Sequence, residues 1–391
     1  MPPAAEVPSV PALLDEAAAR AGVDVDDWGG LGFLPALELL VESCRATARL
    51  NATGAEVLTK VVLRHLRNLL AVRAVVDADP DVADRALGSP IVITGLPRTG
   101  TTLVQNLLAL DPAHRVLRVW EALRPVPVAP RTPSAEVRIG QAEAWLAKLY
   151  ELAPGFEAIH GLSARGPEEC DALLQNTFAS QHFDDMFDAR DYSAWLNSAD
   201  LSEAYAFYRL QLQVLAGTGP AERRWVLKSP SHLGHLDALF EVLPGATVVH
   251  CHRHPLEAVP SYASLVTTIR RPYSDDVDPA VCGRQALERS ALAMDRALAV
   301  RDSGRPEGTF VDVSYPALAR DPIEVLASLY QHLGRPLGAD VEAAMRDWLA
   351  EHPRHHQGVH RYRGADFGLV PDEVAAAFAG YLDRFGALVE S

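Results

Sequence analysis

The segment that most constrains the fold is an apolar run that leads into a turn bracketed by glycines, IVITGLPRTGTT at residues 91–102. The run at 91–94 is continuous and β-branched, which is typical of a strand buried on both faces. Gly95 and Gly100 can adopt backbone angles that point successive N–H groups inward, and a helix starting near Gly100 adds the donors of its first turn. The sequence therefore predicts a strand–loop–helix unit that binds a phosphate or sulfate group.

The spacing inside this loop differs from the nucleotide triphosphatase pattern GxxxxGK[ST]. Gly95 and Gly100 have the required separation, but Thr101 stands at the lysine position and the cation of the loop is Arg98. No lysine follows Gly100 to contact β- and γ-phosphates, which argues against a kinase. The loop residues expected to bind the anion are Gly95, Pro97, Arg98, Thr99, Gly100, Thr101 and Thr102.

A second anion site is predicted in ATVVHCHRHPLEAVPSYASL at 246–265. An apolar strand ends at Arg253, a His-Pro pair breaks it, and the helix that follows carries Ser261. Ligands of open α/β sheets gather at the carboxyl ends of the strands, and a guanidinium with a nearby hydroxyl can hold a phosphate. An arginine at a strand end is often only a solvated cap. This motif therefore indicates an anion site only in combination with the first loop.

Helical segments separate four short apolar runs, which predicts an α/β fold with a central parallel sheet flanked by helices. These runs lie at 91–94, 225–227, 246–251 and 309–313. We expect an N-terminal helical extension at 1–88 and a main domain at 89–391, with a helical, aromatic-rich insert at about 120–222. Helical spacing within the extension covers 13–21, 35–50 and 55–76.

Composition excludes several classes of function. The net charge of −15 disfavours nucleic-acid binding, although a local group of donors can still hold a small anion. The four cysteines are scattered without a CxxC motif, which favours reduced thiols in a cytoplasmic protein. We see no signal peptide and no membrane span.

The longest apolar stretch, 57–76, is interrupted by basic residues at positions 60, 64, 67 and 73. An amphipathic helix with a solvated basic face explains it best, and a membrane-surface helix is the alternative.

Two anion sites on one sheet fit a nucleotide phosphorylated at two positions, and the loop together with Arg253 and Ser261 resembles the sulfotransferases that use 3′-phosphoadenylyl sulfate (PAPS). The likeness covers about 90–370. Segments VWEALRP (119–125), WVLKSPSHL (225–233), VSYPALARDP (313–322) and HRYRGADFGL (360–369) resemble the bacterial and tyrosyl-protein branches of that family. The cytosolic branch has lysine where Arg98 stands and adds a C-terminal basic-glycine loop that is not evident here.

The resemblance implies sulfuryl transfer from PAPS to a hydroxyl, or less readily an amine, by in-line displacement, with the bisphosphate PAP as product. The loop would hold the 5′-phosphosulfate and the Arg253–Ser261 pair the 3′-phosphate. Arg98 is the first candidate to stabilise the bridging oxygen. We expect Tyr315 near the adenosine and Arg361 with Tyr362 closing over the donor.

Lys228 is the second candidate cation, because the chain has only three lysines, at 60, 148 and 228, among 36 basic residues. A surface ion pair is the alternative role.

The general base is predicted at Glu121, where related enzymes place a catalytic carboxylate, and the adjacent Trp120 would bury it. Alternatives are Glu168 or Glu169, His160 and His232, each of which could equally be structural.

The mechanism requires no metal. A histidine-rich stretch at positions 352, 355, 356 and 360 lacks a regular ligand spacing. The acceptor is expected to be a small or lipid-like molecule, uncharged and partly apolar, and a homodimer is possible. A P-loop kinase and a non-catalytic nucleotide-binding protein are the competing functions.

Overall fold

The computed structural model describes residues 7–23, 28, 32–126, 134–153, 157, 161–217, 223–305, 309–353 and 363–390. Its strands are β1 (Ile91–Gly95), β2 (His114–Val116), β3 (Arg224–Lys228), β4 (Thr247–His252) and β5 (Phe310–Ser314). Its α-helices are α1 (Val10–Ala21), α2 (Leu34–Thr47), α3 (Ala52–Ala78), α4 (Thr101–Leu108), α5 (Val119–Leu123), α6 (Ala135–Leu152), α8 (Asp171–Leu174), α9 (Gln181–Phe187), α10 (Arg190–Leu196), α11 (Ser202–Ala216), α12 (Leu236–Val242), α13 (Pro255–Arg270), α14 (Pro279–Arg301), α15 (Tyr315–Arg320), α16 (Pro322–His332), α17 (Ala339–Glu351), α18 (Pro371–Ala377) and α19 (Ala379–Val389). Short 3-10 turns are η2 (Pro80–Asp84), η3 (Gln175–Thr177), η4 (Pro230–His235) and η5 (Gly364–Phe367).

The five strands form one sheet in the order β2-β3-β1-β4-β5, and every pair is parallel. β1 lies at the centre, with Ile93 opposite Lys228 of β3 and Gly95 opposite Cys251 of β4. The chain moves from β1 to one side of the sheet and later to the other, so the carboxyl end of β1 lies at a topological switch point. The predicted α/β fold is confirmed, and the anion loop follows β1 at this point.

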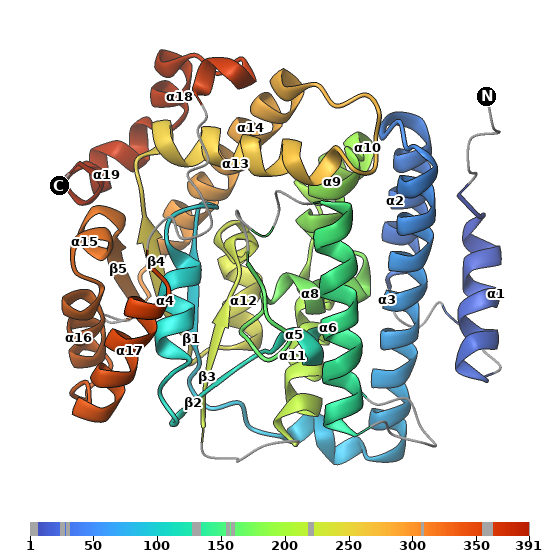
Figure 1. Ribbon diagram of the computed structural model, residues 1–391, viewed down its shortest axis with the longest axis horizontal. Helices are drawn as coiled ribbons and strands as arrows, with labels where there is room; N and C mark the ends of the chain where they lie inside the picture. The colour runs from blue at the N-terminus through green and yellow to red at the C-terminus, as the bar shows by residue number, and fades with distance from the viewer. Residues whose placement is uncertain are drawn as a thin grey trace.

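Alternate residues of β1 bury into two separate cores. Val92 belongs to the larger apolar cluster, which includes the helices of the insert and α12 to α14. Ile91 and Ile93 face the second cluster, which contains residues of α4, α16 and α17. Burial on both faces explains why the strand reads as an unbroken apolar run. Figure 1 shows α15, α16 and α17 on the side of the sheet away from α1, α2 and α3.

Two of the helices before the sheet begin at residues whose side chains cap the first turn. Ser9 accepts a hydrogen bond from the amide of Ala12, and Asn51 accepts one from the amide of Gly54 at 2.9 Å, so each caps the first turn of its helix. α3 has 27 residues, and its buried face packs on α1, α11 and η3. Because these helices share one apolar cluster with the insert and the sheet, the boundary at residue 88 stays a prediction.

Two details of the sheet differ from expectation. β2 was not predicted, because its three residues, His114 to Val116, are mostly polar and carry no strand pattern. β5 is only partly buried, since it is an edge strand with Asp312 exposed, whereas the pattern predicted burial on both faces. The other strand boundaries agree with prediction to within one residue.

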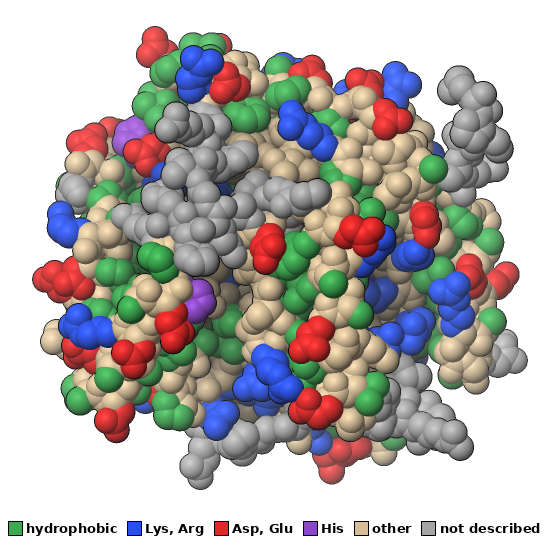
Figure 2. All heavy atoms as spheres, in the orientation of Figure 1, with side chains coloured by type: hydrophobic (Ala, Val, Ile, Leu, Met, Phe, Trp, Pro, Cys, Tyr) green, Lys and Arg blue, Asp and Glu red, His purple; other side chains and the backbone are tan. Residues whose placement is uncertain are grey.

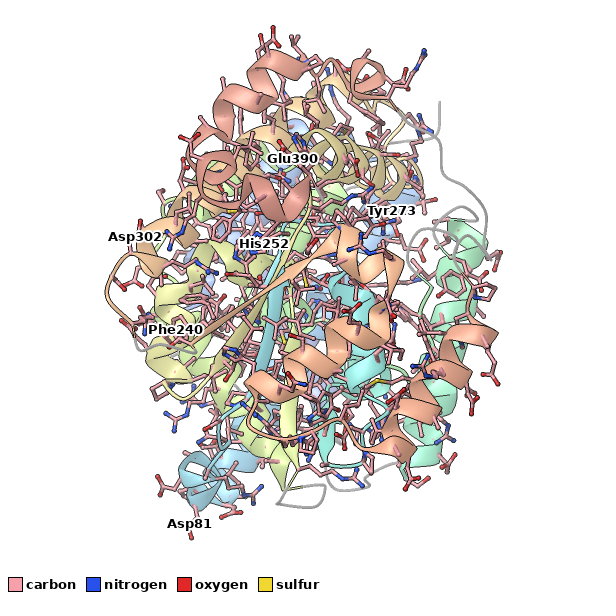
Figure 3. The ribbon with its side chains drawn as sticks, turned by 90° about the vertical axis from the view of Figure 1, so that its left-hand side faces the viewer. Asp81, Phe240, His252, Tyr273, Asp302 and Glu390 are labelled. Carbon is pink, nitrogen blue, oxygen red and sulfur yellow. The ribbon has the colours of Figure 1, made fainter. Side chains whose placement is uncertain are left out.

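Many imidazoles are buried in this fold, and burial lowers the pKa of each. Figure 3 labels His252, which stacks on Tyr381 of the C-terminal helix α19. Burial lowers the pKa of His232 to about 3 and that of His235 to about 4. The same direction holds for His65, His114, His182, His250 and His252. Burial therefore favours the neutral form of these rings.

We expect the free energy of unfolding to fall as the pH drops below about 6.5. Below that pH, histidines of the unfolded chain bind protons, whereas the buried histidines of the folded chain stay neutral. Each such histidine lowers the free energy of unfolding by up to about 1.4 kcal/mol per pH unit. Burial raises the pKa of Glu168 and Asp185 to about 7. Below pH 7 these two carboxyls bind protons more readily in the folded chain and so raise the free energy of unfolding. The buried histidines outnumber them, so the net change is a decrease. Urea unfolding at pH 7.5 and pH 5.5 tests this, and equal stability at both would contradict it.

Candidate active site

The loop at 95–102 has the conformation that its glycines permit. The φ angles are +147° at Gly95 and +90° at Gly100, and Arg98 also has a positive φ of +71°. A Cβ at Gly95 would collide with the carbonyl oxygen of Cys251, and one at Gly100 would lie 2.8 Å from Leu318. The turn is thus packed tightly between β4 and α15, and it delivers the chain to the first turn of α4, where helix N–H groups lack intrahelical partners.

The second predicted motif meets the loop directly. Arg253 follows β4, and its Nη1 donates to the carbonyl oxygen of Arg98 at 2.9 Å. The Nε of Arg98 donates to the hydroxyl of Ser261 at 3.4 Å. The guanidinium of Arg253 also lies 4.3 Å from the centre of the Tyr315 ring, which itself packs against Gly100. The structure therefore brings Arg98, Arg253, Ser261 and Tyr315 together at one edge of the sheet.

Lys228, at the end of β3, points toward the same place. Its side chain is 1% exposed, it pairs with Glu169, and its Nζ lies 3.5 Å from the hydroxyl of Thr102. The amide of Cys170 donates to the Lys228 carbonyl at 2.8 Å, which fixes the acidic segment beside β3. The alternative of a surface ion pair is wrong, because the Lys228 side chain is buried and Glu169 is only 24% exposed.

A cavity of about 870 Å³ opens from the loop. Its walls include Gly95, Arg98, Thr102, Arg253 and Tyr315, and then mainly apolar side chains of the insert and of α3, α6, α13 and α14. Two of the three lysines of the chain, Lys60 and Lys148, line it, whereas Lys228 lies behind its wall and only its partner Glu169 faces the cavity. A volume of this size accommodates a drug-sized or lipid-like molecule.

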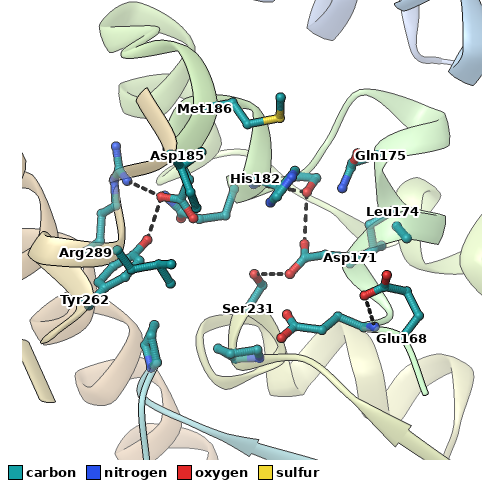
Figure 4. A pocket seen from close by; sticks show the side chains of 18 of the residues that line it. Glu168, Asp171, Leu174, Gln175, His182, Asp185, Met186, Ser231, Tyr262 and Arg289 are labelled. Atoms are coloured by element: carbon teal, nitrogen blue, oxygen red, sulfur yellow. Dashed lines mark hydrogen bonds and ion pairs between the residues drawn. The ribbon is translucent and has the colours of Figure 1, made fainter. Parts of the chain in front are cut away.

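One wall of the cavity is polar (Figure 4). Asp171 is its centre, because Ser229 and Ser231 each donate to Oδ2 at 2.6 Å and Ser180 donates to Oδ1 at 2.9 Å. These bonds connect the segment after Glu169, the turn after β3 and the start of α9. Asp171 thereby holds the surroundings of Lys228 in place.

Asp185 lies farther along this wall (Figure 4). It accepts hydrogen bonds from the Tyr262 hydroxyl at 2.7 Å and from Nη1 of Arg289 at 2.9 Å. His182 also faces the cavity, and its neutral ring is a possible hydrogen-bond partner for an acceptor. Sequence reasoning missed Asp171, His182 and Asp185. The only available signal was the placement of polar residues within the aromatic insert.

Glu168 and Asp185 are both carboxyl groups of the cavity lining whose pKa burial raises to about 7. Glu168 is the nearer in sequence to Glu169, the partner of Lys228. The Oε1 of Glu168 accepts from the amide of Glu169 at 2.7 Å, and its own amide donates to the carbonyl of Leu117 at 2.8 Å. A carboxyl that titrates near neutral pH is suited to act as a general base.

Glu121 is not brought to the cavity with the other predicted residues. Its carboxylate accepts from the amide of Arg118 at 3.1 Å and lies 3.5 Å from Arg115, so it caps the start of α5. His232 is a core residue that bonds to the Tyr205 hydroxyl at 2.9 Å. The predicted residues His160, Arg361 and Tyr362 lie outside the described residues.

One histidine cluster among the described residues has the spacing of a metal site. Ligand atoms of His250, His252 and Asp312 lie within 4.8 Å of one another. However, Nη2 of Arg301 donates to Asp312 at 2.8 Å and its Nη1 lies 3.3 Å from His250 Nδ1, so a guanidinium already provides the positive charge. The cluster is an ion-pair network between β4, β5 and α14. His355, His356 and His360 lie outside the described residues.

Comparison with known proteins identifies the class. Residues 90–339 match the sulfotransferase family, which is more than half of the chain, so the chain belongs to this family. It is therefore a sulfotransferase enzyme, and the family decides against the kinase and the non-catalytic interpretations.

Among solved structures, sulfotransferase STF1 of Mycobacterium tuberculosis and STF9 of Mycobacterium avium are both similar. Each is 30% identical, with a TM-score of 0.83 over 96% of this chain and 100% and 96% of their own chains, respectively. The omega-hydroxy-beta-dihydromenaquinone-9 sulfotransferase Stf3 of Mycobacterium tuberculosis is 26% identical over 315 residues, which is 76% of this chain and 75% of its own. Among the described helices, none combines the length and the apolar character needed to cross a membrane.

Proposed function

We propose that this sulfotransferase moves the sulfuryl group of PAPS to a hydroxyl of a lipid-like acceptor. One observation carries the proposal: two anion motifs, far apart in sequence, meet at the mouth of a mainly apolar cavity of about 870 Å³. The loop at 95–102 would hold the 5′-phosphosulfate, and Arg253 with Ser261 the 3′-phosphate. Tyr315, against Gly100 and Arg253, would lie beside the adenosine. Arg361 and Tyr362 remain predicted donor contacts.

The reaction would be an in-line displacement at sulfur. The acceptor oxygen forms a bond to sulfur while the bond from sulfur to the 5′-phosphate oxygen breaks, and PAP leaves with the negative charge. Arg98 and Lys228 would stabilise that charge. The hydroxyl proton would pass to Glu168, which we propose as the base in place of Glu121 because it faces the cavity. None of these steps needs a metal.

The acceptor class rests on the apolar lining and on one relative. That relative, Stf3, is named for an omega-hydroxylated menaquinone, which is a lipid-like alcohol. The likeness to tyrosyl-protein sulfotransferases stays a prediction. The four cysteines are buried and form no disulfide, which supports the proposed reducing, cytoplasmic setting.

A transfer assay tests the proposal. We expect labelled sulfate to move from PAPS to long-chain primary alcohols in preference to sugars, with no requirement for added magnesium. Phosphate transfer from ATP to the same alcohols is the control for the kinase alternative. Transfer to none of a panel of alcohols and phenols, or transfer only to hydrophilic sugars, would contradict the proposed acceptor.

A further inference from the structure

Arg64 is a cation placed in the acceptor cavity by a helix outside the family match. It belongs to α3, whereas the match begins at residue 90. Its guanidinium carbon lies 5.8 Å from the centre of the Trp145 ring on α6, and its Nη2 lies 3.2 Å from Nε2 of His65. The sequence predicted a solvated basic face, which is wrong for Arg64, because this residue lines the cavity and its Nε is buried.

The charge of Arg64 is not neutralised by an ion pair within the described part of the chain. No carboxylate there lies within 4 Å of it, and its Nε is buried without a hydrogen-bond partner. Two buried arginines near the cavity differ from it, because Arg270 pairs with Asp188 and Arg289 with Asp185. Arg64 is only partly exposed, and a partly desolvated charge without an ion pair is costly, so a ligand of opposite charge would offset part of that cost.

The surroundings of Arg64 are apolar on one side and polar on the other. Val61, Trp145 and Leu149 line the cavity beside it. Glu168 interacts with it electrostatically, which places Arg64 close to the proposed base. Figure 2 shows Lys and Arg side chains gathered over α3.

Two lysines stand at the outer part of the same wall. Lys60 pairs with Glu56 and is 68% exposed, and Lys148 pairs with Glu151 at 3.0 Å and is 60% exposed. Both lysines are ion-paired and well exposed, whereas Arg64 is only partly exposed and has no ion pair among the described residues. Arg64 is therefore the cation of this wall that a ligand would engage.

We propose that Arg64 binds a carboxylate on the acceptor, so that the acceptor is an amphiphile with a hydroxyl for transfer and a carboxylate on an apolar body. The terminal nitrogens of a guanidinium donate charge-assisted hydrogen bonds to carboxylate oxygens. The apolar body would pack on Trp145 and the α3 side chains. This inference rests on the proposed function and adds the class of acceptor. It also replaces the expectation of an uncharged acceptor, which relied on the acidic composition and the aromatic insert.

Binding of two matched ligands tests the inference without any transfer reaction. Dodecanoate and dodecanamide have the same length and shape, but only dodecanoate carries a charge. By calorimetry, we expect the wild-type chain to bind dodecanoate about 10- to 100-fold more tightly. Arg64→Gln should abolish this preference, whereas Lys60→Gln, one turn away on α3 and ion-paired at the surface, should retain most of it.

Equal affinity of the wild type for both ligands, or a preference that survives in R64Q, would overturn the inference. Arg64→Lys keeps the charge without the planar fork, and it should bind dodecanoate with intermediate preference even if R64Q does not fold. R64Q should leave the affinity for PAP unchanged, and a loss there would assign Arg64 to the donor instead. If dodecanoate binds through Arg64 but no alcohol is sulfated, the proposed function fails while the carboxylate site stands.

Discussion

Replacing Arg98 by glutamine is expected to lower kcat about 100- to 1,000-fold, which is the loss seen when one preorganised donor to a developing oxyanion is removed. Arg98 stands in the loop with a positive φ, and its backbone carbonyl is held by Arg253. Because it lies at the junction of both anion motifs, we propose that its charge stabilises the leaving oxygen of PAP. Steady-state kinetics with PAPS and a long-chain alcohol measures the effect.

Arg346→Gln is the matched control for this change. Arg346 is 60% exposed on α17 and pairs only with Glu342 of its own helix among the described residues, so its loss should leave kcat within about twofold. Thermal melting of both variants separates lost chemistry from lost folding. A kcat for R98Q within threefold of the wild type would remove Arg98 from the catalytic role.

Replacing Glu168 by glutamine should lower kcat about 100- to 10,000-fold, which is the usual contribution of a general base. Because burial raises its pKa to about 7, Glu168 is mostly protonated below that pH and cannot accept a proton. For the wild type we therefore expect kcat to rise about tenfold from pH 6 to pH 7.5 and then level off. That acidic limb should disappear in E168Q.

Glu121→Gln is the control that separates the two candidate bases. Its carboxylate caps α5 and pairs with Arg115, so the variant should lose some stability, about 1 kcal/mol, and keep the pH profile. If instead E121Q loses turnover and E168Q keeps it, Glu121 is the base and the cavity-facing carboxylate is structural.

The loop at 95–102 could be predicted because its chemistry is local. Gly95 and Gly100 are required by positive φ angles within six residues, and the strand before them is a continuous apolar run. Arg253 and Ser261 were also accessible, because a strand end and the helix after it occur together in sequence. The rule that ligands gather at the carboxyl ends of parallel strands predicted that both motifs serve one sheet, but their direct contacts with Arg98 were not predicted.

The residues of the acceptor cavity could not be predicted from local sequence in the same way. Glu168 and Glu121 both precede or follow apolar residues, and only the three-dimensional path of the chain shows which of them faces the cavity. Arg64 looked like one of several basic residues on an amphipathic helix, since helical spacing gives the face but not its neighbours. β2 was missed because it is short and polar, and only its pairing with β3 makes it a strand.

The central claim is that one donor is held at two separate phosphate positions, and the affinities for PAP and for adenosine 5′-monophosphate test it most directly. The monophosphate lacks only the 3′-phosphate that Arg253 and Ser261 would hold. By calorimetry, we expect PAP to bind about 100-fold more tightly to the wild type, and Ser261→Ala to reduce this ratio severalfold. Equal affinity of the wild type for the two nucleotides would contradict the account.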